Sequence, residues 1–217
     1  MLKDFLILDN SEKDAKSNMA FDEKLILDFE KGFYEKHKRF FRIYKWPQKS
    51  ITYSYKQQML EAVSFIDNSR RITGGGYVFH SEGDIVFSCV GSLSDLYFPK
   101  KMKEKMGWVS DLVAELLVKN GVKVQIESKA FSMANIDFCA SYYNPYELYV
   151  DGYKICGITI RKLKKSFIIQ GVLHVFSNIN SFEQLTGGFL PFLTQGLRYK
   201  SIVDGDVFYN NLLDSLK

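Results

Sequence analysis

The sequence predicts an α+β fold in a single domain over residues 1–217, with a mixed, largely antiparallel sheet flanked by helices. The length of 217 residues suits one domain. Hydrophobic residues make up 46% and charged residues 25%, which is typical of globular chains and excludes disordered, collagen-like and coiled-coil classes. Strand patterns, a hairpin and a few helical patterns follow one another without a repeat, and this mixture indicates the α+β class.

Three longer helices are predicted, and Glu61 to Ile66 could form a brief one. The first begins after Ser17–Asn18, which is typical of an N-cap and precedes apolar residues at helical spacing. The second lies within residues 100–119, where the apolar pattern is amphipathic, and it ends at Asn120–Gly121, a favourable C-cap pair. The third is expected around Val207–Leu216.

Strands are predicted where apolar residues alternate or where aromatic and β-branched residues gather. They cover residues 39–46, 50–55, 84–91, 122–126 and 167–176. Residues 146–160 are predicted to form a β-hairpin, because Asp151–Gly152 is a strong two-residue turn signal.

The turn also sets the register of this hairpin. It pairs Val150 with Tyr153, Tyr149 with Lys154, and Glu147 with Cys156. Because side chains alternate along a strand, Lys154 shares a face with Glu147 and Tyr149. Spacing alone favours a surface lysine paired with Glu147, which stabilises a protein little. The alternative is a cation that acts on a nearby thiol.

Charge, cysteine and histidine usage exclude further classes. The net charge of +4 is too small to indicate nucleic-acid binding. No apolar run approaches the ~20 residues that span a bilayer, and the N-terminus lacks the pattern of a signal peptide. Three widely spaced cysteines favour a reducing, cytoplasmic setting. His37, His80 and His174 lie far apart without local ligand spacing, so no metal site is expected.

Cations gather in three parts of the chain. They are Lys36, Lys38, Arg39, Arg42, Lys45 and Lys49; Lys100, Lys101, Lys103 and Lys105; and Arg161, Lys162, Lys164 and Lys165. Solvated faces are the favoured interpretation. The alternative is a surface for acidic protein partners, since complementary charge accelerates association.

The glycine run at 70–80, RRITGGGYVFH, is the least ordinary segment. Three successive glycines allow the backbone to approach a ligand closely, and paired arginines suit a phosphate or carboxylate. The segment fits neither the P-loop nor the GxGxxG pattern. Composition does not separate a ligand loop from a flexible hairpin tip with two surface arginines.

The three cysteines differ in their surroundings. Cys89 lies in an alternating apolar strand and Cys156 in the hairpin, so both are expected to pack in the core. Cys139 lies in an irregular polar and aromatic stretch before the hairpin. Taken alone it is more often inert than catalytic, because a nucleophilic thiolate needs a nearby cation or helix N-terminus.

Five segments resemble the lipoate protein ligase and octanoyltransferase family, whose catalytic domain is related to biotin protein ligase. They are NMAFDE at 18–23, RIYKW at 42–46, Tyr55 with Gln57, RRITGGGYVFHSEGD at 70–84, and CASYYNPYELYVDGYKICG at 139–157. They stand in the family's order and cover most of residues 17–175. The resemblance implies the single α+β catalytic domain of the biotin and lipoate ligases, without an accessory C-terminal domain.

The resemblance also implies residue roles. The residues that would line the acyl pocket are Arg71, Gly74, Gly75, Gly76, Tyr77, Val78, Phe79 and His80. The hairpin lysine that contacts the acyl carbonyl would be Lys154. In octanoyltransferases with a cysteine upstream of the hairpin, the nucleophile stands eight residues before a Glu and fifteen before the lysine. Cys139, Glu147 and Lys154 have both spacings. The second octanoyltransferase type has a later cysteine, where this chain has Gln195.

The resemblance therefore implies an octanoyltransferase that uses Cys139 and Lys154. The octanoyl group would pass from acyl carrier protein to a lysine of a lipoyl-domain protein, such as a glycine cleavage H-type protein or a dehydrogenase E2 subunit. No metal or other cofactor, nucleic acid or membrane is expected to take part. One alternative is a lipoate-protein ligase that uses ATP and Mg²⁺ to form lipoyl-adenylate; another is a non-catalytic member that binds acyl groups or a partner.

Two positions depart from the family pattern. The family usually has a run of small residues after the hairpin glycine, and this chain has Ile158-Thr159. The family often has a histidine before the glycine of the next strand, where this chain has Gln170. Both positions touch the expected acyl pocket, and they motivate the non-catalytic alternative.

Overall fold

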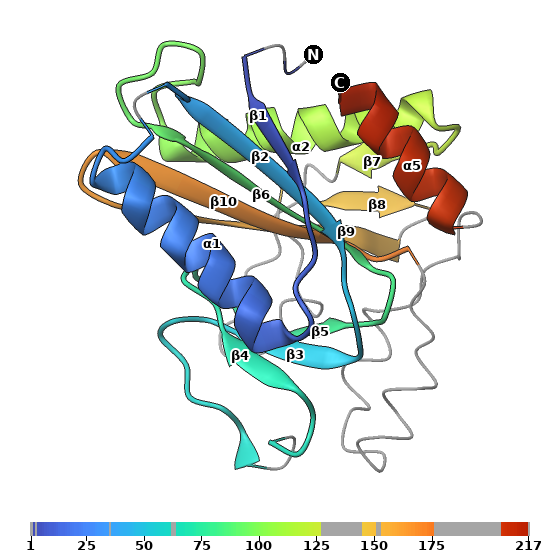
Figure 1. Cartoon of the computed structure of the whole chain (residues 1–217). Helices are drawn as coiled ribbons and strands as arrows, with labels where there is room; N and C mark the ends of the chain where they lie inside the picture. Colours follow the sequence, from blue (N-terminus) through green and yellow to red (C-terminus); the bar gives the residue numbers. More distant parts are fainter. Residues whose placement is uncertain are drawn as a thin grey trace.

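A seven-stranded sheet forms the centre of the structure, and a three-stranded sheet lies below it in Figure 1. The computed structural model describes residues 2, 4–34, 36–61, 64–126, 145–150, 153–175 and 205–216. The strands of the large sheet lie in the order β1, β2, β6, β10, β9, β8 and β7. Their bounds are β1 Leu6–Asp9, β2 Arg39–Lys45, β6 Ile85–Ser92, β7 Gln125–Ile126, β8 Leu148–Val150, β9 Tyr153–Lys162 and β10 Ser166–Leu173.

The large sheet is mixed and largely antiparallel, so the predicted fold class is confirmed. Within the described residues, β1 and β2 pair in parallel, and every other neighbouring pair of this sheet is antiparallel. At the centre, β10 lies between β6 and β9. Gln170 of β10 stands opposite Ser88 on one side and Thr159 on the other.

The small sheet supports the glycine run. Its strands β3 (Ser50–Tyr53), β4 (Asn68–Arg70) and β5 (Val78–His80) lie in the order β4, β3, β5. Residues 71–77, which connect β4 to β5, form the glycine loop. Because both ends of this loop continue into strands that pair with β3, the sheet fixes where the loop begins and ends.

Three helices of the described chain cover the large sheet (Figure 1). Helix α1 (Ala15–Glu30) packs on one face, and α2 (Met102–Lys119) and α5 (Gly205–Leu216) pack on the other. The last two match their predicted positions. The predicted start of α1 was wrong, because Asp14 is the N-cap and its carboxylate accepts a bond from the Ser17 backbone N–H, 2.7 Å.

Asn18, predicted as a cap residue, instead lies buried inside the first turns of α1. Its side-chain amide donates to the carbonyl oxygens of Glu12 and Asp14, each at 3.1 Å. The Ser17–Asn18 pattern therefore predicted a helix start in the right region of the chain. The Asn18 side chain, however, binds the segment that precedes α1 and does not cap the helix.

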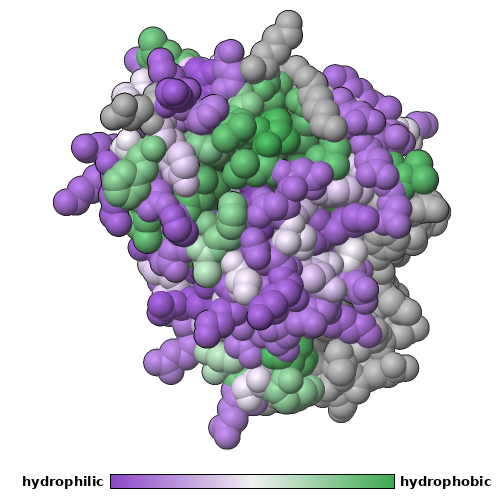
Figure 2. Space-filling model, viewed as in Figure 1, coloured by the Kyte–Doolittle hydropathy of each residue, from purple (hydrophilic) through white to green (hydrophobic). Residues whose placement is uncertain are grey.

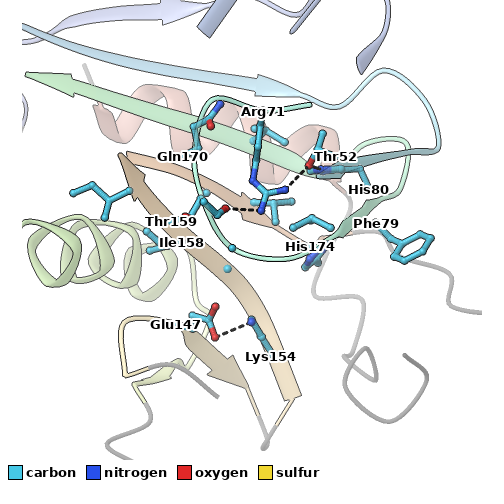
Figure 3. Close-up of a pocket in the computed structure, with 18 of the residues that line it drawn as sticks. Thr52, Arg71, Phe79, His80, Glu147, Lys154, Ile158, Thr159, Gln170 and His174 are labelled. Atoms are coloured by element: carbon cyan, nitrogen blue, oxygen red, sulfur yellow. Dashed lines mark hydrogen bonds and ion pairs between the residues drawn. The ribbon is translucent and has the colours of Figure 1, made fainter. Parts of the chain in front are cut away.

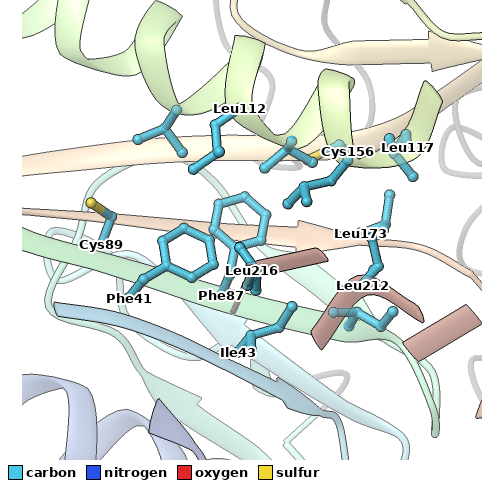
Figure 4. Packing of buried hydrophobic residues seen from close by; sticks show 14 of the residues in the cluster. Phe41, Ile43, Phe87, Cys89, Leu112, Leu117, Cys156, Leu173, Leu212 and Leu216 are labelled. Carbon is cyan, nitrogen blue, oxygen red and sulfur yellow. The ribbon is translucent and has the colours of Figure 1, made fainter. Parts of the chain in front are cut away.

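The larger apolar cluster fills the space between the sheet and helices α2 and α5. Figure 4 shows Phe41 and Phe87 of neighbouring strands facing Leu112 of α2 and Leu212 of α5. Cys89 and Cys156 are fully buried in this cluster, as predicted. Burial raises the pKa of both thiols well above the usual range, so these cysteines stay protonated and act as small core residues.

The opposite face of the sheet carries a buried polar network instead of an uninterrupted apolar layer. Arg42 of β2 and Asp22 of α1 are both fully buried, and the Arg42 guanidinium donates to the Asp22 carboxylate at 2.9 Å. Ser88 Oγ donates to the same carboxylate oxygen at 3.0 Å. Gln170 Nε2 donates to the other Asp22 oxygen at 2.7 Å. One aspartate therefore connects α1 to β2, β6 and β10.

The structure corrects the predicted basic surfaces at two positions. Arg42 points inward to Asp22, and its guanidinium also lies 3.8 Å from the centre of the Tyr44 ring. Lys105 is buried on α2, where its ammonium donates to the Pro99 carbonyl and faces the ring of Phe167. Both side chains belong to the interior, because a buried partner or an aromatic ring satisfies the charge.

Most of the face seen in Figure 2 is hydrophilic, and one apolar area lies beside β1. Among the described residues, no helix combines the length and the apolar character that a membrane span requires.

We expect Asp22→Asn to lower the free energy of unfolding by about 3 kcal/mol, because the Arg42 charge would stay buried without its counter-charge. Urea unfolding followed by circular dichroism measures this loss. Asp28→Asn is the matched control, since Asp28 pairs with the exposed Lys24 on the same helix and should change stability by less than about 1 kcal/mol. Equal, small effects of both substitutions would contradict the assigned importance of the buried pair.

Candidate active site

A cavity of about 300 Å³ lies between the large sheet and the glycine loop, a volume at the lower end for ligand pockets (Figure 3). Apolar residues from α1, β6 and β10 form one part of its lining, and polar residues from the small sheet and the hairpin form another. The lining residues are Met19, Thr52, Arg71, Gly74, Gly75, Val78, Phe79, His80, Val86, Met106, Glu147, Lys154, Gly157, Ile158, Thr159, Ile160, Gln170, Gly171, Val172 and His174.

Arg71 holds the glycine loop from inside. Its side chain is buried, and Nη2 donates to the carbonyl oxygens of Gly74 and Gly76 at 2.7 and 2.6 Å. Gly75 between them has a φ of +89°, a left-handed conformation that glycine adopts without strain. The arginine fork therefore organises the loop rather than pointing to solvent, and the interpretation as a flexible tip with two surface arginines is wrong for Arg71.

Thr73 ties the loop to the buried network. Its hydroxyl donates to Gln170 Oε1 at 2.6 Å, and the amide nitrogen of the same glutamine donates to Asp22. Gln170, where the sequence departs from the family pattern, thus accepts from the loop on one side and donates to the α1 carboxylate on the other. An amide suits this position, because it carries an acceptor and a donor in one side chain.

Six of the eight predicted pocket residues line the cavity. They are Arg71, Gly74, Gly75, Val78, Phe79 and His80. Gly76 and Tyr77 are not among its described lining residues. Tyr77 is buried, and its hydroxyl donates to the Gln58 carbonyl. Arg70, the other half of the arginine pair, is exposed.

The hairpin has the predicted register next to its turn. Val150 stands opposite Tyr153, and Tyr149 opposite Lys154. One pair further, the register shifts, so that Leu148 rather than Glu147 stands opposite Cys156. The two-residue turn does not predict this irregularity. It moves Glu147 out of its predicted position opposite Cys156.

Glu147 and Lys154 form a buried ion pair in the cavity wall. Lys154 Nζ lies 2.7 Å from Glu147 Oε2, and the two side chains are only 7% and 3% exposed (Figure 3). The Tyr149 hydroxyl donates to the same carboxylate oxygen at 3.3 Å. The predicted partner was therefore right, but the predicted surface position was wrong. A buried ammonium at a pocket wall is a candidate functional group.

Gly157 leaves space beside this pair. A Cβ at this position would lie 3.6 Å from Lys154 Cε and 3.8 Å from Glu147 Oε1. The absence of a side chain therefore keeps the cavity open next to the ammonium.

Two histidines and an aspartate form another polar part of the site. His80 Nε2 and Thr52 Oγ1 are 2.8 Å apart, and the His80 ring stacks on Trp46 with 4.1 Å between ring centres. Burial lowers the pKa of His80 well below its usual value, and the nearby His174 and Arg71 lower it further. His80 is therefore a neutral imidazole at pH 7.

His174 is oriented by a buried carboxylate. Its Nδ1 lies 2.9 Å from Asp84 Oδ2, which also accepts from the Ser81 backbone N–H, and Asp84 Oδ1 accepts from the Val175 N–H. Sequence reasoning did not place Thr52, Asp84 or His174 in the site. No local motif joins them, because the pairing of the two sheets and the end of β10 bring them together.

Cys139, the predicted nucleophile, lies outside the described residues. Within the described ranges, no group of three or more histidine, cysteine or carboxylate side chains is arranged to hold a metal ion. The described site thus consists of an apolar cavity, a rigid glycine loop and a buried ammonium. This arrangement is that of a ligand pocket that suits a molecule with an apolar part and one polar or anionic group.

Residues 14–189 match the family model of the lipoyl protein ligase A/B catalytic domain. The chain therefore belongs to the lipoyl protein ligase A/B catalytic domain family.

Two curated relatives carry the name octanoyltransferase LipM. The one from Clostridioides difficile is 22% identical over 161 residues, which cover 70% of this chain and 58% of that protein. The one from Oceanobacillus iheyensis is 25% identical over 164 residues, which cover 72% of this chain and 59% of that protein. The matched part thus spans less than two thirds of the length of these relatives.

Two solved structures share the fold. A lipoate-protein ligase A bound with ATP has a TM-score of 0.62 at 18% identity, over 97% of this chain and 93% of that one. A bipartite lipoate protein ligase from Thermoplasma acidophilum, described together with its E2 lipoyl domain, has a TM-score of 0.64 at 17% identity, over 97% and 80%. At these identities the likeness shows the fold alone.

We expect Arg71→Ala to raise amide hydrogen exchange across residues 72–78 by at least about tenfold, because two charge-assisted bonds to the loop carbonyls are lost. Arg70→Ala is the matched control, since Arg70 is the exposed neighbour. Exchange measured by mass spectrometry on both variants checks this. Unchanged protection in Arg71→Ala would show that the loop keeps its shape without the guanidinium.

We also expect stability to fall as pH drops from 7 towards 5, in part through His80. Its pKa in the folded protein lies below the value of about 6.5 in the unfolded chain, so the unfolded state binds the extra proton first. His80→Phe keeps a ring against Trp46 and removes the titration. The free energy of unfolding should then depend less steeply on pH, by up to about 1.4 kcal/mol per pH unit. Identical slopes in both proteins would contradict the neutral, buried imidazole.

Proposed function

We propose that this protein is an octanoyltransferase that moves an octanoyl group from octanoyl-acyl carrier protein, through a thioester on Cys139, to a lysine of a lipoyl-domain protein. The observation that carries the proposal is the buried Lys154 ammonium in the wall of an apolar cavity beside the glycine loop. The name of the curated relatives supports the same reaction.

The cavity suits an acyl chain. Met19, Val86 and Val172 give it an apolar part beneath α1, where a hydrocarbon tail is removed from water. Lys154, at the other part of the lining, supplies a cation for the acyl carbonyl. An octanoyl thioester has this same division, with an apolar tail and a single polar group at its reactive end.

The first step is attack of the Cys139 thiolate on the thioester carbonyl of the donor. The new C–S bond forms as the carbonyl becomes a tetrahedral oxyanion, and its collapse expels the donor thiolate, which takes up a proton. The octanoyl group then stays on Cys139 as a thioester. Lys154 favours the thiolate and the oxyanion by its charge.

The second step is attack of the acceptor lysine amine on the Cys139 thioester. The amine gives a proton to solvent water as the C–N bond forms, and the C–S bond breaks so that the cysteine leaves as a thiolate, which regenerates the enzyme. Glu147 holds Lys154 Nζ in one position through this cycle, because the ion pair is buried and has little freedom to rearrange. Cys139 stands eight residues before Glu147 and fifteen before Lys154, and this spacing supports the proposed role of the cysteine beside Lys154.

The proposed reaction needs neither a nucleotide nor a metal ion, since the thioester of the donor is already activated. The proposed partners are an acyl carrier protein and a lipoyl-domain acceptor such as a glycine cleavage H-type protein or an E2 subunit. The lipoate-ligase alternative would instead use ATP and Mg²⁺ in the same domain.

We expect Cys139→Ala to abolish octanoyl transfer to a lipoyl domain, whereas Cys89→Ala and Cys156→Ala retain most of it. The two control cysteines are buried and protonated, so they are unable to act as nucleophiles. A mass shift on the acceptor domain measures transfer, with octanoyl-acyl carrier protein as donor and no nucleotide present.

Transfer by Cys139→Ala at the wild-type rate would remove the thioester intermediate. If, in addition, all variants transferred octanoate or lipoate only when ATP and Mg²⁺ were supplied, the ligase alternative would replace the proposal. If neither condition gave transfer with the wild-type protein, the non-catalytic alternative would remain.

A further inference from the structure

A second pocket lies on the outer side of the glycine loop and shares part of its wall with the acyl cavity. Its volume is about 500 Å³. Its lining includes Tyr55, Lys56, Arg161 and Lys162. Gly74, Gly75 and Ile160 also line the acyl cavity. The loop and one strand position therefore separate two neighbouring pockets of different character.

The second pocket is strongly cationic. Lys56, Arg161 and Lys162 contribute three positive charges, and no aspartate or glutamate is among its described lining residues. None of these three cations pairs with a carboxylate anywhere in the described part of the chain. A concave site with three uncompensated cations attracts an anion.

Arg161 is held in a fixed orientation. Its guanidinium lies 4.1 Å from the centre of the Tyr55 ring, and Nη1 donates to the Ile72 carbonyl oxygen at 2.7 Å. Lys56 Nζ lies 5.6 Å from the centre of the same ring. Because one bond and one aromatic ring orient the arginine fork, less side-chain freedom is lost when it binds an oxyanion.

The position of the pocket along β9 indicates which anion would occupy it. Lys154 stands near the start of this strand and Arg161 near its end, seven residues later. At ~3.3 Å per residue, the backbone positions of the two residues are ~23 Å apart along the strand. The proposed function puts the acyl carbonyl beside Lys154. An acyl-adenylate has its phosphate bonded directly to that carbonyl, whereas a carrier-bound thioester has its phosphate at the far end of the long pantetheine arm.

We propose that the pocket of Lys56, Arg161 and Lys162 binds the phosphate ester of the donor's 4′-phosphopantetheine arm. This inference rests on the proposed function, and it adds a recognition site for the donor that is separate from the acyl cavity. Arg161 supplies a planar pair of donors to the phosphate oxygens, and the two lysines add charge. The glycine loop between the pockets supports the middle of the arm.

The test compares two small donors that differ only in the phosphate, octanoyl-4′-phosphopantetheine and octanoyl-pantetheine. We expect the wild-type KM for the phosphorylated donor to be at least about tenfold lower, because one charge-assisted contact changes affinity by this amount or more. Arg161→Gln should bring the two KM values together. Lys164→Gln, which removes an exposed charge outside the pocket, should preserve the difference.

Calorimetry with unacylated 4′-phosphopantetheine and with AMP tests the site without turnover. We expect the first to bind, with an affinity that falls at high ionic strength and in Arg161→Gln. Binding of AMP alone would overturn the assignment to the pantetheine arm and give the pocket to a nucleotide phosphate.

The two proposals fail separately. Transfer from both donors at equal KM would overturn the phosphate site and leave the octanoyltransferase standing. Absence of transfer from octanoyl-acyl carrier protein and from both small donors, together with Arg161-dependent binding of 4′-phosphopantetheine, would overturn the transferase and leave the site. Equal increases in the KM for the phosphorylated donor in Arg161→Gln and Lys164→Gln would show that general surface charge causes the effect. This result would contradict the proposal.

Discussion

The buried carboxylate of Asp22 joins helix α1 to the large sheet and, through Gln170, to the glycine loop. It accepts from Arg42 of β2, from Ser88 of β6 and from Gln170 of β10, so one side chain sets the position of α1 over three strands. Gln170 then reaches Thr73 and fixes the glycine loop. Since removal of any member leaves a buried polar group unsatisfied, the network favours one arrangement of helix, sheet and loop.

This arrangement explains why a rigid cavity exists beside so many glycines. The loop would be mobile by composition, yet the Arg71 guanidinium joins the carbonyls of Gly74 and Gly76, and Thr73 joins the loop to the sheet. The hairpin contributes the charged wall, where Lys154 is buried with Glu147. The position of this charged wall against the glycine loop therefore depends on supports that come from distant segments of the chain.

Much of the fold could be predicted, because helix and strand periodicity and the Asp151–Gly152 turn are local signals. The burial of Arg42 and Lys154 could not, since both look like surface cations and only tertiary pairing removes them from water. The register shift near Leu148 and the meeting of His174 with Asp84 depend on contacts between segments far apart in the sequence. The predicted pocket residues came from family resemblance, and the structure places six of the eight at the cavity.

In the proposed reaction the acyl group is bound covalently to Cys139 between donor and acceptor. The most direct measurement is the intact mass of the protein after incubation with octanoyl-acyl carrier protein, without nucleotide or acceptor. We expect a gain of one octanoyl group, located at Cys139 by peptide mapping and released by hydroxylamine as a thioester should be. An unmodified wild-type protein that nevertheless transfers octanoate when the acceptor is added would contradict it.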